Sequence, residues 1–174
     1  SSRAPDYGRL KEYAPFSFTT EETGGIIGNG DITMDWIVHV LKRTVDTQYR
    51  TKADRRHTFL AGSSMGGLMT LYGLLAYPEV FSRGAALSPS LWIDAEKVKA
   101  MIRHARVKRN TVLYMDYGAL EFADHPHSRS LLAEGSALLI EYRSPMVEAF
   151  NGRNFTIRIP ATTASREPGI FLKI

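Results

Sequence analysis

The pattern of apolar and polar positions along the chain predicts alternating helices and strands. Between residues 31 and 49 the apolar residues recur mainly at spacings of three and four, which indicates an amphipathic helix. Short apolar runs bounded by charged or turn-forming residues predict strands instead. In chain order we expect helices over 31–49, 66–77, 94–104 and 128–150, and strands over 57–61, 83–87, 111–115 and 155–159.

Strands that alternate with helices favour an α/β fold with a mostly parallel sheet and helices on both faces. The strand over 57–61 is expected to be buried in that sheet. Residues 1–30, rich in Gly, Pro, Ser and Thr, are expected to form loop, with 14–19 as the strand-like run within them. Asp31 is a candidate N-cap for the helix that follows. The whole chain, 1–174, fits a single domain.

Composition narrows the function classes. The chain has no cysteine, which excludes disulfides, zinc–thiolate sites and a cysteine nucleophile. The formal net charge of +4 is not gathered on one helix, so we expect no nucleic-acid partner. No apolar run reaches the roughly 18 residues of a membrane span, and residues 1–10 do not resemble a signal peptide. We therefore expect a cytoplasmic chain without a membrane anchor.

The strongest chemical signal is Gly62-Ser63-Ser64-Met65-Gly66, which matches the pattern G-x-S-x-G between a predicted strand and a predicted helix. In this setting Ser64 is the candidate nucleophile on a strained turn. We expect Gly62 and Gly66 to remove side chains that would collide there. The Met65 amide, at the start of the helix, is the candidate oxyanion donor.

The stretches 57–81 and 86–92 resemble the esterase D-like family of α/β-hydrolases, and the resemblance extends loosely over about 10–160. It implies a three-layer α/β-hydrolase fold, no cofactor and a small-molecule ester as substrate. Family members carry the nucleophile, then an acid, then a histidine. The segment after the strand 111–115 matches the acid's position, with Glu121 as the candidate and Asp116 as the alternative. Trp92 follows a strand end, where ligands bind in such folds, and is a candidate for substrate binding.

The family's catalytic histidine has no counterpart, because Ala164 stands where the resemblance places it. Alanine cannot accept the proton of Ser64. His125 and His127 satisfy the chain order but share a loop with Glu121, and the run 124–127 is expected to be a surface loop that holds no metal. The remaining histidines are expected on helices (His39 and His104) or at the wrong end of the sheet (His57).

The ends of the chain also depart from the family pattern. The usual first strands are missing, and the tail over 161–174 is atypical, which suggests a truncated or frame-altered member. Three functions stay open. The first is a serine esterase that works through an acyl-enzyme on Ser64 and is impaired by loss of the histidine. The second is a non-catalytic relative that binds an ester ligand or a protein partner, and the third is an acyltransferase. The oligomeric state is also open.

Overall fold

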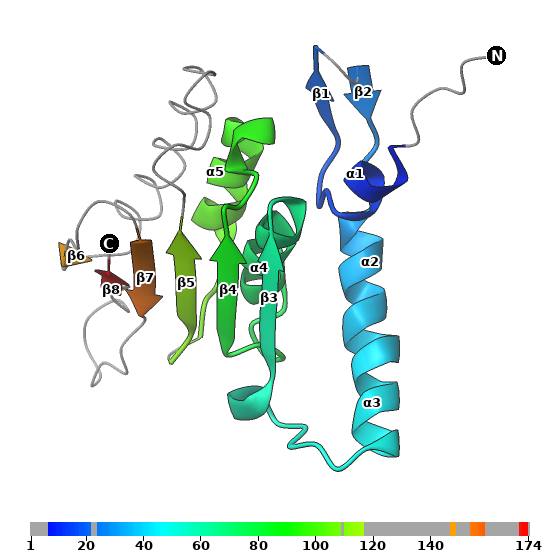
Figure 1. Ribbon diagram of the computed structural model, residues 1–174, viewed down its shortest axis with the longest axis vertical. Helices are drawn as coiled ribbons and strands as arrows, with labels where there is room; N and C mark the ends of the chain where they lie inside the picture. The colour runs from blue at the N-terminus through cyan, green and yellow to red at the C-terminus, as the bar shows by residue number, and fades with distance from the viewer. Residues whose placement is uncertain are drawn as a thin grey trace.

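The computed structural model describes residues 7–21, 24–108, 110–116, 147–148, 154–158 and 171–173. Within these ranges the strands form two sheets, a hairpin of β1 and β2 and a six-stranded sheet in the order β3-β4-β5-β7-β8-β6 (Figure 1). The strands are β1 (Phe18–Thr20), β2 (Gly24–Ile26), β3 (Phe59–Ser63), β4 (Arg83–Leu87), β5 (Val112–Asp116), β6 (Val147–Glu148), β7 (Asn154–Arg158) and β8 (Phe171–Lys173). The α-helices are α1 (Gly8–Glu12), α2 (Gly30–Trp36), α3 (Lys42–Gln48), α4 (Met65–Ala76) and α5 (Ala95–His104). A π-helical turn over Ile37–Leu41 joins α2 to α3, and 3-10 turns cover Arg55–His57 and Leu91–Ile93.

The half of the large sheet formed by β3, β4 and β5 follows the predicted alternation. The strands β3, β4 and β5 run parallel, and the crossovers between them contain α4 and α5. The strand β7 then pairs antiparallel with β5, and β8 pairs antiparallel with β7. The predicted parallel sheet is therefore correct for β3, β4 and β5, while β7, the strand predicted over 155–159, runs antiparallel to β5.

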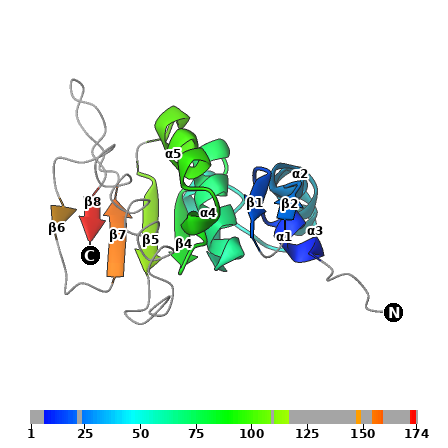
Figure 2. The same ribbon diagram turned by 90° about the horizontal axis from the view of Figure 1, so that it is seen from above.

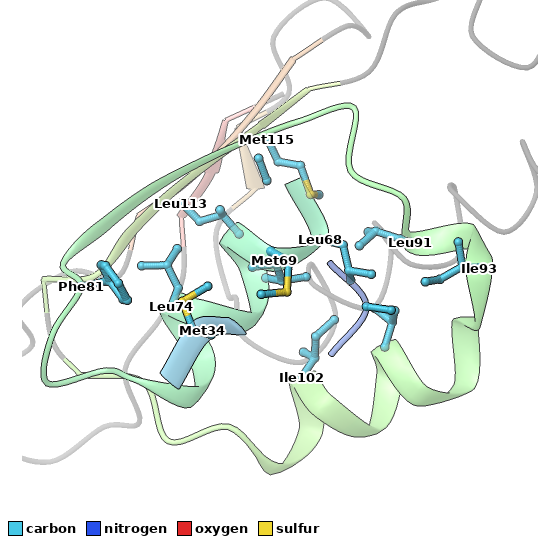
Figure 3. Packing of buried hydrophobic residues seen from close by; sticks show 14 of the residues in the cluster. Met34, Leu68, Met69, Leu74, Phe81, Leu91, Ile93, Ile102, Leu113 and Met115 are labelled. Atoms are coloured by element: carbon cyan, nitrogen blue, oxygen red, sulfur yellow. The ribbon is translucent and has the colours of Figure 1, made fainter. Parts of the chain in front are cut away.

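Two helices cover one face of the parallel strands. Because β3, β4 and β5 follow one another in the same direction across the sheet, right-handed crossovers place α4 and α5 on the same side. Figure 3 shows the apolar side chains that fill this layer. Leu68, Leu71 and Leu74 of α4 are almost fully buried, together with Ile102 of α5 and Met115 of β5. The helix α4 therefore lies at the centre of the core. Its packing fixes the position of the residues at its first turn.

The long helical region next to the sheet has more than one apolar face. Met34 and Val38 are buried, and Met34 packs against the core around α4. Ile32, Trp36 and Val40 form a second row, and they are 66%, 51% and 49% exposed. The periodicity predicted the helix correctly, but it could not say which of two rows would face the core. Figure 2 shows α1, α2 and α3 grouped at the opposite end of the molecule from β6.

The start of the chain differs from the sequence expectations. Residues 7–30 contain α1 and the hairpin of β1 and β2 rather than loop alone. The helix α2 begins at Gly30, so Asn29 takes the N-cap position that was expected for Asp31, and Asp31 lies in the first turn. The strand-like run over 14–19 overlaps β1 at Phe18 and Thr19, whereas β2 escapes detection because three residues give too little periodicity. The pairing of β1 with β2 supplies the hydrogen bonds of both strands.

The nucleophile strand is also placed differently. It covers Phe59–Ser63 rather than 57–61, and it is not fully buried, since Phe59 is 52% exposed. The reason is that β3 lies at the edge of the described sheet and pairs there only with β4. The Arg83 guanidinium covers the Phe59 ring at 5.0 Å from its centroid. Further along the chain, β6 is a strand in a region expected to be helix, and β8 lies in the tail over 161–174 that departs from the family pattern.

Candidate active site

Ser64 occupies a tight turn between the end of β3 and the start of α4. Its dihedral angles are φ 57° and ψ −120°, a left-handed conformation that costs free energy for a residue with a side chain. Backbone hydrogen bonds hold the turn, from the Ser64 amide to the Leu87 carbonyl at 2.9 Å and from the Leu68 and Ser90 amides to the Ser64 carbonyl, each at 3.1 Å. The surrounding structure therefore maintains a strained conformation at this serine.

The glycines around Ser64 differ in what they allow. A Cβ atom on Gly62 would lie 2.5 Å from the carbonyl carbon of Gly66, so only glycine fits there. A Cβ atom on Gly66 would meet nothing within 4 Å, and the expectation that Gly66 relieves a collision is wrong. The second close approach is at Gly67 instead, where a Cβ atom would lie 2.9 Å from the Cα of Pro89. The absence of a side chain at Gly67 therefore lets the start of α4 pack closely against the segment after β4.

A cavity of about 720 Å³ opens beside Ser64. Most of its wall is apolar, and Arg9 is the charged side chain among the described residues that line it. The lining comes from α1 (Arg9, Leu10), the residue after it (Tyr13), α2 and the π-helical turn (Thr33, Met34, Ile37), β3 (Leu60, Ala61, Gly62, Ser63), and Ser64 with the start of α4 (Met65, Gly66, Met69, Thr70). No local pattern in the sequence indicates that α1 and α2 form this wall, because they lie beside Ser64 only in the folded chain.

Met65 is the first residue of α4 and lines the cavity beside Ser64. The first amides of a helix have no intrahelical acceptor, and the helix dipole gives this end a partial positive charge. An oxygen that gains negative charge next to Ser64 would be stabilised by a donor at this position. The geometry is compatible with the role expected for the Met65 amide.

Asp116 is the last residue of β5, so it lies at the same carboxyl end of the parallel strands as Ser64, with β4 between β3 and β5. The strand register aligns Ser63 with Leu87 and Leu87 with Asp116. The Asp116 carboxylate accepts hydrogen bonds from the Ser88 amide at 3.2 Å and from the Tyr114 hydroxyl at 3.0 Å. Burial raises the pKa of Tyr114, and its hydrogen bond to Asp116 adds to that effect. Neighbouring strands lie about 4.8 Å apart, so roughly 10 Å separates β3 from β5.

The other predicted site residues fall in two groups. Glu121, His125, His127 and Ala164 lie outside the described residues. Trp92 lies in the 3-10 turn after β4, partly buried against the core, and it is not part of the cavity lining. Its role in substrate binding stays a prediction.

The three histidines within the described ranges lie away from Ser64. His57 precedes β3, at the opposite end of that strand, and its Nδ1 lies 2.7 Å from Asp54. His39 makes an edge contact with the ring of Tyr77, which follows the far end of α4. His104 ends α5, with its Nδ1 2.7 Å from the Ala100 carbonyl. None of these three is in place to accept the proton of Ser64.

No group of three or more metal-ligating side chains gathers within the described ranges of the chain. No helix in the same ranges is long and apolar enough to cross a lipid bilayer.

Comparisons with known proteins agree with the resemblance. The model of a family described as "Putative esterase" matches residues 20–134. The iron(III) salmochelin esterase of Escherichia coli O6:H1 is 35% identical over 78 residues, which cover 44% of this chain and 19% of that protein. Among solved structures, the siderophore hydrolase EstA from Aspergillus nidulans matches with a TM-score of 0.55 and 18% identity over 81% of this chain and 56% of its own. EstB from the same organism matches with a TM-score of 0.47 and 23% identity over 77% of this chain and 52% of its own.

The structural match to EstA shows the α/β-hydrolase fold that the sequence predicted. The chain spans about half the length of these two solved structures and a smaller share of the curated relative.

Proposed function

Because the chain belongs to the Putative esterase family, we propose that it is a serine esterase that hydrolyses small-molecule carboxylic esters through an acyl-enzyme on Ser64. The observation that carries this proposal is the conformation of Ser64. A serine held at φ 57° on a strand-to-helix turn, at the wall of a cavity of about 720 Å³, is placed to attack a bound carbonyl group. A serine without a chemical role has no evident reason to keep that strain.

The proposed reaction has two halves. The Ser64 Oγ attacks the ester carbonyl carbon while its proton passes to a base, and the Met65 amide donates to the carbonyl oxygen as that oxygen becomes negative. The carbon–oxygen bond to the alcohol then breaks, and the alcohol leaves with the proton. Water attacks the acyl group in the same way, the carboxylic acid departs, and Ser64 regains its proton.

The catalytic acid of this scheme has candidate residues, whereas the general base has none at the family's position. Glu121 is the proposed acid, since it matches the family's position. Asp116 is the alternative that geometry supports, because the Ser88 amide and the Tyr114 hydroxyl fix its carboxylate at the edge that also carries Ser64. The base is the weak part, because Ala164 takes the place of the family's histidine. We therefore propose an impaired enzyme, for which oxyanion stabilisation and binding leave about 10³–10⁴-fold acceleration over water.

The substrate class follows from the cavity and the relatives. Its lining residues Leu10, Met34, Ile37 and Met69 favour an ester with an apolar or aryl portion. The identity of 35% to an iron(III) salmochelin esterase makes iron(III) salmochelin the first natural ester to test.

The test is covalent labelling with a fluorophosphonate probe, read by intact mass. We expect slow formation of one adduct on the wild-type chain, none on Ser64→Ala, and the wild-type rate on Ser82→Ala, which changes a buried serine that precedes β4. Rapid labelling would mean that a histidine other than one at position 164 serves as the base. Absence of any adduct would favour the second candidate, a non-catalytic relative that binds an ester ligand, which Ala164 supports.

A further inference from the structure

Ser90 contacts the proposed nucleophile from the segment after β4. Its side chain is buried, with 3% of the residue exposed, and its Oγ lies 3.2 Å from the Oγ of Ser64. The Ser90 amide also donates to the Ser64 carbonyl at 3.1 Å. A buried hydroxyl group costs free energy unless it is hydrogen-bonded. The hydrogen bond between these two side chains therefore belongs to the folded structure of the turn.

The direction of that hydrogen bond matters for chemistry. A serine hydroxyl has one proton and two lone pairs. To attack a carbonyl carbon, Ser64 needs one lone pair for the new bond and must release its proton to a base. If Ser64 donated its proton to Ser90, that proton would point away from the base. If Ser90 donates instead, Ser64 keeps both its proton and one lone pair available.

Resting on the proposed function, we propose that Ser90 is a positioning residue for Ser64. Its hydroxyl donates to the Ser64 Oγ, fixes the rotamer of that side chain, and stays hydrogen-bonded while the oxygen gains negative charge. A hydrogen bond to a charged group is stronger than one to a neutral group, so this contact tightens as the reaction proceeds.

The backbone around the turn does not depend on the Ser90 hydroxyl. The Ser64 amide bonds to the Leu87 carbonyl, and the close approach of Gly67 to Pro89 packs the same segment against α4. Removal of the hydroxyl alone should leave these contacts intact and release only the Ser64 side chain. Ser90 is also absent from the cavity lining, so its loss should not change how a ligand binds there.

The experiment compares labelling rates of the full chain as wild type, Ser90→Ala, Ser90→Cys and Ser82→Ala. In the labelling step the Ser64 Oγ bonds to phosphorus, the phosphorus–fluorine bond breaks, and fluoride leaves while the serine proton passes to the base. We expect Ser90→Ala to lower the maximal labelling rate about tenfold, which corresponds to about 1.4 kcal/mol. The probe concentration at half-saturation should stay unchanged.

The two companion variants separate positioning from packing. Ser90→Cys keeps the shape of the side chain with a somewhat larger atom, and its thiol is a weak donor, so it should be slow like Ser90→Ala. It also serves if the alanine variant fails to fold. Ser82→Ala removes another buried serine hydroxyl, one without a hydrogen-bond partner in the described structure, and should label at the wild-type rate. Wild-type labelling of Ser90→Ala, or equal slowing of Ser82→Ala, would overturn the proposal.

A second readout keeps this inference separate from the proposed function. If wild-type protein is not labelled at all, the proposed esterase function fails, and crystal structures of wild type and Ser90→Ala decide the role of Ser90. We expect the Ser64 Oγ to leave its wild-type rotamer in the variant. An unchanged Ser64 rotamer would refute positioning by Ser90, whatever the activity.

Discussion

The two outer glycines of the G-x-S-x-G motif should respond in opposite ways to alanine. A Cβ atom on Gly62 would lie 2.5 Å from the Gly66 carbonyl carbon, whereas ordinary contact begins at 3.4 Å, so the turn must open by about 1 Å. The hydrogen bond from the Ser64 amide to the Leu87 carbonyl resists this opening. We expect Gly62→Ala to lower the free energy of unfolding by about 3 kcal/mol, the upper part of the usual range for overpacking.

Gly66→Ala is the matched control in the same motif. Its Cβ atom would meet nothing within 4 Å, and Gly66 is not among the residues with positive φ. Alanine is a better helix former than glycine and restricts the unfolded chain, so this variant should gain up to about 1 kcal/mol. The two variants should therefore differ by about 4 kcal/mol.

Equilibrium urea unfolding, followed by circular dichroism, measures this difference. With a urea dependence of about 2 kcal/mol/M, the unfolding midpoints of the two variants should lie about 2 M apart. Equal destabilisation by both substitutions would refute the reasoning, because it would mean that the motif requires both glycines for their backbone freedom. A stable Gly62→Ala variant would show that the turn can relax around the new methyl group.

Three further predictions concern the rest of the fold. Tyr114→Phe removes the hydrogen bond to Asp116 and should cost about 1 kcal/mol in urea unfolding near neutral pH. Since the pKa of Tyr114 is raised above its ordinary 10.0, the stability it contributes is present below pH 10 and is lost above it, so the difference between wild type and variant should shrink there. Asp94→Ala removes the N-cap acceptor of the Lys97 amide on α5 and should cost about 1 kcal/mol, whereas Glu96→Ala, in the same exposed turn, should cost less than half of that. Leu71→Ala, at a fully buried position of α4, should cost about 3 kcal/mol in the same assay, and a loss below 1 kcal/mol would mean that the core collapses around the cavity.

Local sequence signals predicted the middle of the molecule well. The strand over 83–87 was predicted with its observed bounds, and the helices that became α4 and α5 were predicted within one residue at each end. These elements carry strong cues, namely Pro78 after the helix, Ser88-Pro89 after the strand, and a capping Asp94. The prediction was weaker near the chain's start, where α1, β1 and β2 are each five residues or fewer.

The residues of the candidate site also differ in whether the local sequence could indicate them. Ser64 and Met65 could be found from the sequence, because a strand, a tight turn and a helix follow one another within a few residues. Asp116 could be proposed only as an alternative, since nothing local indicated that the Ser88 amide and the Tyr114 hydroxyl would hold its carboxylate. Arg9, Leu10 and Ser90 were not singled out at all, because each reaches Ser64 only through the fold.

The sequence by itself determined the alternation of elements, the family and the serine on its turn, because periodicity, turn chemistry and the G-x-S-x-G motif are properties of neighbouring residues. Only the tertiary structure decided which apolar row of the long helical region faces the core, that Gly66 stands in open space, and that a cavity lies between α1, α2 and β3. It also decided that Ser90, 26 residues along the chain, shares a hydrogen bond with Ser64. Contacts of this kind depend on how strands pair and helices pack, and that arrangement is fixed by the whole core rather than by any local stretch of sequence.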